Sequence, residues 1–528
     1  MRAAGAAIAG AWVLWAAGDA RADGPAPDED RAAFEAELFG AVETSTAISP
    51  PSAAPTSSRS DFEEELFGAP PPPPSAERAG ETESSGILDA LQDSLRNASD
   101  RLAIGGTLFL RIEYRALDEG EPSDFALVSP NTLDLYLDAR PMDRVRTYVR
   151  GRLAYDPTAA ADETADSADL TDPNATATLG GGGRPVTQVL LDQLWVKFDL
   201  ARSVFLTVGK QRVRWGTGRI WNPTDFLNAQ RFNPLALFDP RLGVSLVKLH
   251  VPFEDAGANL YAIVNLDGAD QLDRVGAAAR AEIAFDTTEL AASASWRDGE
   301  PLRFGVDASA GVGDFELRAE LALLYDDPLP VFSGDFDPSQ PAALTGVRVR
   351  YREDSVLPQL VLGADVTLGY GDGQEAILGL EYFFNSTGYD GAELYPVLAL
   401  APTLGQQFPA QAEQIGLRTP TPAVFQPFYL GRHYLSLLAL FPTPLGLEDH
   451  SLVLTGLVNL SDRSALVRVD HTVRLFRFLS FRSYINAHFG DLGEFRLGFE
   501  LGPISPLGAG ISLVPPLFEL GFALSTTL

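Results

Sequence analysis

The side chains best suited to binding chemistry are basic residues that share alternate positions in two stretches of the chain. In an extended strand, alternate side chains point to the same side, so each stretch would form a row of positive charge. Such rows attract carboxylate, phosphate or sulfate groups. The first row comprises Arg144, Arg146, Arg150 and Arg152, and the second comprises Lys210, Arg212 and Arg214.

Nearby carboxylates offer these rows a second kind of partner. The candidates are Asp134, Asp138, Asp192 and Asp199. We expect a mixed network of arginines and carboxylates, and a strip of net positive charge is the sharper hypothesis.

Residues for other kinds of chemistry are few. The 5 histidines are scattered without ligand spacing, and the chain has 0 cysteines. No nucleophile elbow, phosphate-binding loop or dinucleotide fingerprint occurs. The acidic residues Asp326, Asp327, Asp335 and Asp337 are interpreted as solvated loop charge rather than as a weak calcium site. We therefore predict no metal, no cofactor and no enzymatic activity.

The elements that must position the basic rows are β-strands. Beyond residue 100, apolar and charged residues alternate, as in Leu108, Leu110, Ile112 and Tyr114 against Phe109, Arg111, Glu113 and Arg115. Segments of about ten residues that end in aromatics, with arginines and carboxylates on the polar face, indicate lipid outside and a wet lumen inside. The pattern predicts an all-β fold over residues 101–528: an antiparallel up-and-down transmembrane barrel of about 18 strands, with 16 to 20 allowed.

The connections between these strands alternate in length. Short turns are expected near Arg140 to Asp143 and Phe285 to Leu290. Long loops are expected from Asp156 to Arg184, Asp326 to Thr345 and Tyr389 to Phe428. This asymmetry is typical of outer-membrane barrels, with the short turns in the periplasm.

The first 100 residues are of a different kind. Residues 1–22 are interpreted as a signal peptide that ends in Ala20-Arg21-Ala22. Residues 23–84, rich in Pro, Ala, Ser and Glu, predict a disordered periplasmic tether. Residues 85–100 predict a short amphipathic helix with Leu88, Leu91 and Leu95 on one face. The formal net charge of −31 lies largely in linkers and loops, and we expect no nucleic acid among the partners.

The tether contains a near-perfect repeat of eight residues. Phe34 to Ala41 recurs as Phe62 to Ala69, with one difference. The apolar residues of each copy would share one face of a helical turn: Phe34, Leu38 and Phe39 in the first, and Phe62, Leu66 and Phe67 in the second. Two hypotheses stay open: a bivalent motif for a periplasmic protein, or a duplicated linker without a partner.

The most distinctive stretch of the barrel follows its fifth predicted strand. It runs from Val208 to Asp225 and contains Trp215, Gly216, Arg219, Trp221, Asn222, Pro223 and Asp225. It resembles the Gly-Arg-Gln, Trp-Gly and Asn-Pro-x-Asp signature of uncharacterised porin-like outer-membrane barrels of Gram-negative bacteria, which are similar to alginate-export barrels. The stretch from Gly379 to Asn385, with Gly388 and Tyr389, resembles a second element of those families.

The apolar character of this stretch predicts that it folds against the inner wall and narrows the pore. The pore-lining candidates are Arg146, Arg150, Arg152, Lys210, Arg212 and Arg214. We therefore expect an outer-membrane channel for small solutes, with anions as the candidate class, whose partners are membrane lipid and the barrel-assembly machinery. The alternatives are a barrel for polysaccharide export that recruits a periplasmic partner, and an outer-membrane hydrolase. The sequence does not indicate the oligomeric state.

Overall fold

The computed structural model describes residues 101–118, 126–142, 144–159, 186–200, 203–228, 231, 233–236, 241–339, 346–371, 373–407, 409–418, 424–502 and 511–528. The predicted signal peptide, the tether with its two repeats and the helix at 85–100 lie outside these residues. So does most of the predicted long loop from Asp156 to Arg184.

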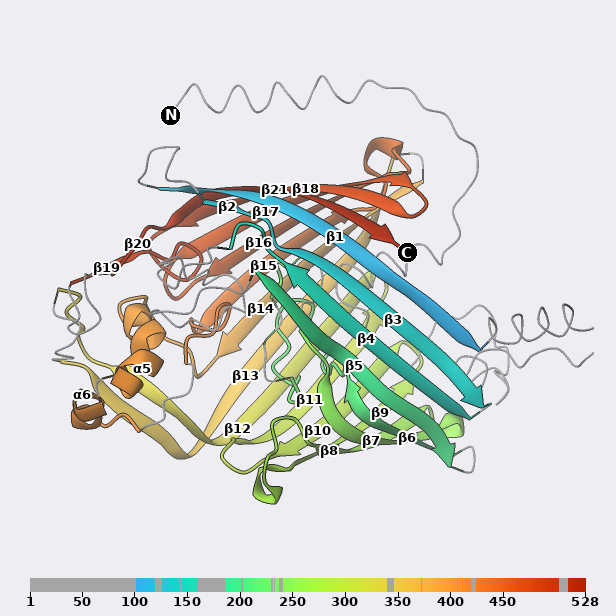
Figure 1. The fold of residues 1–528 in the computed structure, drawn as a ribbon, viewed down its shortest axis with the longest axis horizontal. Helices are drawn as coiled ribbons and strands as arrows, with labels where there is room; N and C mark the ends of the chain where they lie inside the picture. The colour runs from blue at the N-terminus through green and yellow to red at the C-terminus, as the bar shows by residue number, and fades with distance from the viewer. Residues whose placement is uncertain are drawn as a thin grey trace, which may run out of the picture. The chain divides into compact units, whose positions relative to one another are not determined.

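One antiparallel sheet forms the wall of the barrel (Figure 1). Its first half comprises β1 (Leu102–Leu117), β2 (Ala126–Val128), β3 (Asn131–Met142), β4 (Val145–Tyr155), β5 (Thr187–Leu200), β6 (Val204–Gln211), β7 (Val244–Phe253), β8 (Ala258–Asn265), β9 (Gly276–Phe285) and β10 (Thr288–Trp296). Its second half comprises β11 (Leu302–Val312), β12 (Phe315–Ser333), β13 (Arg348–Tyr370), β14 (Gln374–Asn385), β15 (His433–Phe441), β16 (His450–Asn459), β17 (Ser464–Phe476), β18 (Leu479–Gly490) and β21 (Pro516–Thr527).

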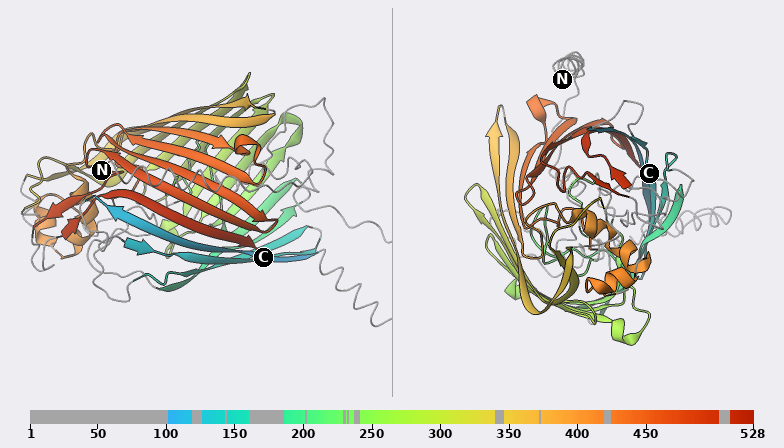
Figure 2. Two further views of the ribbon diagram at one scale, coloured as in Figure 1. Left: turned by 90° about the horizontal axis from the view of Figure 1, so that it is seen from above. Right: turned by 90° about the vertical axis from the view of Figure 1, so that its left-hand side faces the viewer.

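The sheet closes on itself between its first and last strands. Strand β1 pairs with β3 on one side and with β21 on the other, in register from Thr107 opposite Thr527 to Ala116 opposite Phe518. The three-residue β2 pairs with β1, and the wall itself has 18 strands. Figure 2 shows these strands as a ring. The predicted barrel of about 18 strands is confirmed.

The wall is polar inside and apolar outside. On β12, the outward Leu317 and Leu321 are 44% and 39% exposed, whereas the inward Glu320 between them is 1% exposed. On β11, the outward Val306 is 55% exposed and the inward Asp307 only 2%. A water-soluble protein shows the opposite distribution. The outer face is therefore the surface that contacts lipid.

Aromatic side chains mark both ends of this apolar face. Exposed aromatics near the end with the short turns are Phe253, Phe285, Phe315 and Phe476, and those towards the other end are Tyr155, Trp296, Tyr325 and Phe489. Two such girdles are expected where a barrel wall crosses the two interfaces of a bilayer. No helix among the described residues is long and apolar enough to cross a membrane.

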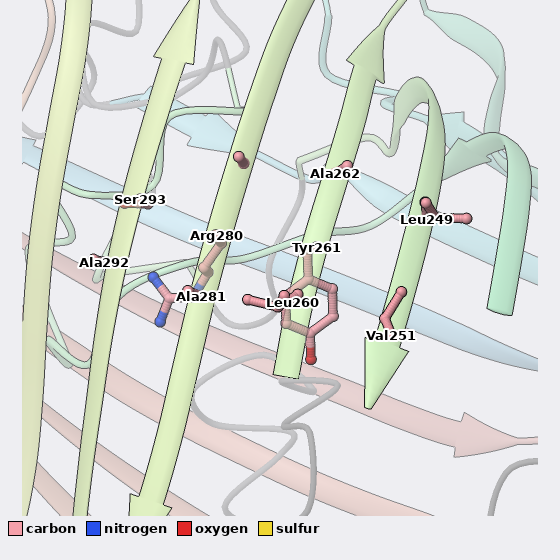
Figure 3. A pocket seen from close by; sticks show the side chains of 10 residues that line it. Leu249, Val251, Leu260, Tyr261, Ala262, Arg280, Ala281, Ala292 and Ser293 are labelled. Carbon is pink, nitrogen blue, oxygen red and sulfur yellow. The ribbon is translucent and has the colours of Figure 1, made fainter. Parts of the chain in front are cut away.

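A hollow of about 510 Å³ lies in the wall over β7 to β10, and Figure 3 shows the side chains that line it. Its lining includes outward-facing Leu249, Leu260, Ala262, Ala279 and Ala281. The alanines leave the depression because they are smaller than the leucines at its edge. The hollow therefore belongs to the apolar outer face and not to the lumen.

Connections between strands alternate in length, as predicted. Asp286 and Thr287 join β9 to β10, whereas residues 386–432 join β14 to β15. One boundary differs from the expectation: Asp326 to Ser333 belong to β12, which pairs with β13 up to Ser333 opposite Arg348. Register shifts on both sides of Asp327 accommodate Pro328 and Pro330, the prolines that led to the prediction of a loop.

The long connections build a small structure at one end of the barrel (Figure 2). It contains α5 (Tyr395–Gln407), α6 (Pro409–Gln414) and the hairpin of β19 (Phe499–Leu501) with β20 (Ile511–Leu513). Tyr395 and Leu398 of α5 share an apolar cluster with Phe332 of β12 and Leu501 of β19. Single 3-10 turns occur at η2 (Glu254–Ala256), η3 (Leu272–Arg274) and η5 (Pro444–Gly446).

Candidate functional site: a constriction inside the barrel

The segment that follows β6 lies inside the barrel. We call residues 212–236 the constriction segment, of which 212–228, 231 and 233–236 are described. Trp215 packs with inward-facing Leu246 of β7 and Leu324 of β12, and Trp221 packs with Phe383 of β14 and Leu457 of β16. The segment therefore reaches across the lumen, from the end of β6 to the opposite wall.

Glu320 of β12 holds the first part of the constriction segment. The backbone N–H groups of Thr217 and Gly218 both donate to Glu320 Oε1 at 2.5 Å. The hydroxyl and the backbone N–H of Thr224 donate to Glu320 Oε2 at 2.9 and 3.3 Å. Gly216 has φ +95°, and a β-carbon there would lie 2.6 Å from Glu320 Oε1. Glycine at this position therefore allows the backbone to approach the carboxylate.

Glu381 of β14 holds the next residues in the same way. It accepts hydrogen bonds from the backbone N–H groups of Arg219 (2.8 Å), Ile220 (3.0 Å) and Trp221 (2.9 Å). The Arg219 side chain donates to Asp365 Oδ2 of β13 at 2.6 Å. Asp365 also pairs with Arg318 of β12. The segment is thus fastened to three neighbouring strands by carboxylates.

Trp221 is the largest fully buried side chain of the constriction segment. It is 0% exposed and packs against both Phe383 and Tyr434, with ring centroids 5.6 and 5.4 Å away. Its indole N–H donates to the Phe428 carbonyl at 3.0 Å, which satisfies the one polar atom of the buried ring. Trp221 therefore joins the segment to the loop that carries Phe428.

Asp225 fixes the return of the segment. Its carboxylate accepts hydrogen bonds from the Trp215 backbone N–H at 3.3 Å, from Asn228 at 2.8 Å and from Arg241 at 3.0 Å. Asn222 is 4% exposed, and its carbonyl accepts a hydrogen bond from the Asp225 N–H at 3.2 Å. Pro223 lies between them, in the turn. The predicted Asn-Pro-x-Asp element is therefore a buried turn that closes the segment on itself.

The predicted arginines of β4 lie on the inward face and pair with carboxylates. Arg152 bonds to Asp134 at 2.8 Å, and Arg150 bridges Asp134 at 2.6 Å and Asp192 at 3.4 Å. Arg212 completes the chain with Asp192 at 3.0 Å. These three arginines and two aspartates form a continuous network, which we call the arginine ladder. Its net charge is +1.

In the ladder, two of the arginines are more exposed to solvent than either aspartate. The side chains of Arg150 and Arg212 are 26% and 29% exposed, whereas that of Asp192 is 0% exposed and that of Asp134 is 9% exposed. The carboxylates lie beneath the two guanidinium groups, which face the open part of the lumen. Arg152, at 4%, is the buried member. Arg146 forms a separate pair with Asp138 at 2.8 Å.

Lys210 does not join the ladder, which is a correction to the predicted second row. Along β6, Thr207 and Gln211 are buried on the inward face, whereas Val208 is 39% exposed on the outward face. Lys210 has the parity of Val208 and lies opposite Leu194, which is 49% exposed. Strand β6 ends at Gln211, so parity no longer governs Arg212 and Arg214. Arg214 donates to the Gly218 carbonyl at 2.9 Å within the constriction segment.

An aromatic row runs beside the arginine ladder on the inner wall. The rings of Tyr136, Tyr148 and Trp195 are stacked, with centroids 5.9 and 5.4 Å apart and interplanar angles of 18° and 20°. The Arg146 guanidinium carbon lies 5.6 Å from the Trp195 ring centroid. Tyr136 covers Gly105 of β1, where a β-carbon would lie 2.5 Å from the Tyr136 Oη. The row therefore spans β3, β4 and β5.

The residues that anchor the segment were not predicted as site residues. Glu320 and Asp365 carry no local motif, and only their inward parity on β12 and β13 marks them. Glu381 and Phe383 belong to the second element, Gly379 to Asn385, whose resemblance to the porin-like families was noted from sequence. The structure shows that the two distinctive elements of the chain contact each other.

Four of the five histidines lie within hydrogen-bond distance of another side chain. His250 lies 2.9 Å from Asn259, His433 lies 2.8 Å from Tyr382, and His450 lies 2.9 Å from His471. The described residues contain no group of three or more His, Cys, Asp or Glu that could hold a metal ion.

No protein-family model and no curated protein matches the chain. Solved structures similar to it include OccK11 (OpdR) of Pseudomonas aeruginosa, at 10% identity over 82% of this chain and 96% of that one, with a TM-score of 0.44. OccAB1 of Acinetobacter baumannii is 9% identical over 80% and 96%, with a TM-score of 0.45. A BenF-like porin of Pseudomonas fluorescens is 13% identical over 81% and 99%, with a TM-score of 0.45. The geometry described above is that of a closed 18-stranded antiparallel barrel with a segment of its own chain across the lumen.

Proposed function

We propose that the protein is an outer-membrane channel that passes small solutes, with a preference for anions, between the constriction segment and the wall of β3 to β5. The observation that carries the proposal is the layering of charge in the arginine ladder. The guanidinium groups of Arg150 and Arg212 face the lumen above carboxylates that are 0% and 9% exposed.

The closed wall supports the choice of a channel. An apolar outer face and a polar inner face are the two requirements of a pore that crosses lipid. The constriction segment crosses the lumen from the end of β6 and contacts β7, β12 to β14 and β16. A solute is therefore left with the side of the lumen that the ladder and the aromatic row line.

The ladder supports a preference for anions. A guanidinium that faces water offers N–H donors to carboxylate, phosphate or sulfate oxygens, whereas a buried carboxylate offers little to a passing cation. Because each lumen-facing arginine is already hydrogen-bonded to a carboxylate, its hold on a solute is weak enough to allow release. A channel needs this balance between entry and exit.

Ion currents through the purified protein in planar bilayers test the proposal. We expect a measurable conductance and, in a salt gradient, a reversal potential that shows anion preference. Replacing Arg150 and Arg212 by glutamine reduces that preference. The matched control is Arg274→Gln, because Arg274 lies in a loop with its side chain 58% exposed.

Two results would contradict the proposal. One is the absence of current both in the intact protein and after removal of residues 215–240. The other is an anion preference that Arg150→Gln and Arg212→Gln change no more than the control does.

A further inference from the structure

Two buried carboxylates carry most of the polar attachment of the constriction segment. Glu320 accepts four hydrogen bonds from Thr217, Gly218 and Thr224. Glu381 accepts three from the backbone N–H groups of residues 219–221. Six of these seven donors are backbone N–H groups, which cannot act as acceptors. The arrangement therefore fits the ionised form of both glutamates.

The charged groups around Glu320 are themselves paired. Asp307 of β11 faces it and is bonded to Arg280 of β9 at 2.6 and 2.8 Å. Arg280 also pairs with Glu282 at 2.6 Å. No arginine or lysine among the described residues forms an ion pair with Glu320. The negative charge of Glu320 is therefore stabilised mainly by the N–H and O–H groups of the constriction segment.

The surroundings of Glu381 are similar. The guanidinium of Arg318 from β12 lies nearby, but it pairs with Asp365 of β13. Arg219 of the segment also directs its side chain to Asp365. From β15, the Ser436 hydroxyl donates to the Glu381 carbonyl and not to its carboxylate. Backbone N–H groups of the segment are thus the hydrogen-bond donors to the Glu381 carboxylate.

We propose that Glu320 and Glu381 are the positioning residues of the constriction segment and that their protonation releases it, so that acid widens the pore. The proposal rests on the proposed channel function and adds its regulation. A hydrogen bond to a carboxylate is about twice as strong as one to a neutral oxygen. Protonation also places an O–H group among donors that have no free acceptor for it.

Single-channel recordings between about pH 8 and about pH 4, a range that includes the ordinary pKa of glutamate, test the proposal. We expect the conductance of the natural protein to rise on acidification. Glu320→Gln and Glu381→Gln remove the charge and should show the acid conductance already at about pH 8, with a flatter pH response. Glu289→Gln is the matched control, because Glu289 faces the lumen from β10 and no hydrogen bond to the described part of the segment is found for it.

A cross-link gives a second test that does not alter either glutamate. A β-carbon at Gly305 of β11 would lie 3.0 Å from Thr224 Cγ2, an atom whose place a cysteine sulfur can take, and 2.7 Å from Ser293 Oγ, which must rotate away. The chain has 0 cysteines, so the pair Thr224→Cys and Gly305→Cys is unique. We expect the acid response to disappear when the pair is oxidised and to return when it is reduced.

The outcomes separate this proposal from the channel function. An acid response that persists in both glutamine variants, or in the oxidised cysteine pair, overturns the role of the two glutamates. A natural protein whose conductance is constant over the pH range also overturns it and leaves the channel intact. No current at any pH in any variant contradicts the channel itself.

Discussion

Replacing Trp221 by alanine should release the constriction segment more strongly than any other single truncation within it. The side chain is 0% exposed, stacks on Phe383, packs at a tilt of 40° against Tyr434, and donates to the Phe428 carbonyl at 3.0 Å. Truncation of a buried tryptophan costs about 3–5 kcal/mol. Because about 1.4 kcal/mol corresponds to a factor of ten, the ratio of undocked to docked segment should rise by roughly two to four orders of magnitude.

Trp221→Phe separates the ring from its hydrogen bond. The phenyl ring keeps most of the stacking but leaves the Phe428 carbonyl without its donor, at a cost of about 1–3 kcal/mol. This corresponds to a rise of roughly 5- to 150-fold in the ratio of undocked to docked segment. The two variants should therefore rank in the order alanine, phenylalanine, natural protein.

Single-channel recordings measure this ranking as the fraction of time spent in the higher conductance state. Circular dichroism checks that each barrel is folded. Trp296→Ala is the control, because Trp296 is 52% exposed on the outward face of β10. Conductance of Trp221→Ala equal to that of the control would refute the view that this segment narrows the lumen.

Four further predictions concern other parts of the chain. Asp192→Asn should increase the anion preference because it removes a carboxylate from the arginine ladder, and an unchanged reversal potential would contradict this. Gly216→Ala should act in the same direction as Trp221→Ala in the same recordings, because a β-carbon at φ +95° adds about 1–3 kcal/mol of strain. Burial raises the pKa of Glu494 to about 8, so the folded state keeps a proton that the unfolded chain loses. Protection of residues 424–432 from hydrogen exchange should then fall as pH rises from about 4.5 to about 8, and Glu494→Gln should flatten the change. A peptide of residues 34–69 should bind a periplasmic protein saturably if the repeats are a partner motif, whereas a duplicated linker predicts no binding.

The barrel was predictable because one physical requirement acts on every strand. Lipid outside and water inside impose a period of two, which the alternation of Leu110 and Ile112 with Arg111 and Glu113 shows directly. The position of the constriction segment was predictable for a similar reason, because tryptophans in a long connection must find an apolar surface.

The partners of that segment were not predictable from local pattern. Glu320 lies 103 residues from Thr217, and Glu381 lies 161 residues from Ile220, so no spacing relates them. The prediction that Lys210 faces the lumen together with Arg212 and Arg214 was wrong. It assumed that one alternation covers all three residues, whereas β6 ends at Gln211 and the alternation ends with it. The prediction that a long loop begins at Asp326 was wrong, because prolines can occupy an irregular part of a strand pair.

The attachment of the constriction segment also has a consequence for the order of folding. The segment leaves the wall after the fifth strand, but its carboxylate anchors arrive with β12, β13 and β14. Contacts so far apart in the chain form late, because much of the intervening chain must be ordered first. The segment therefore cannot form these hydrogen bonds until the opposite wall, which carries the acceptors, has assembled. Narrowing of the lumen is then a late event in the maturation of this barrel, after most of its wall is in place.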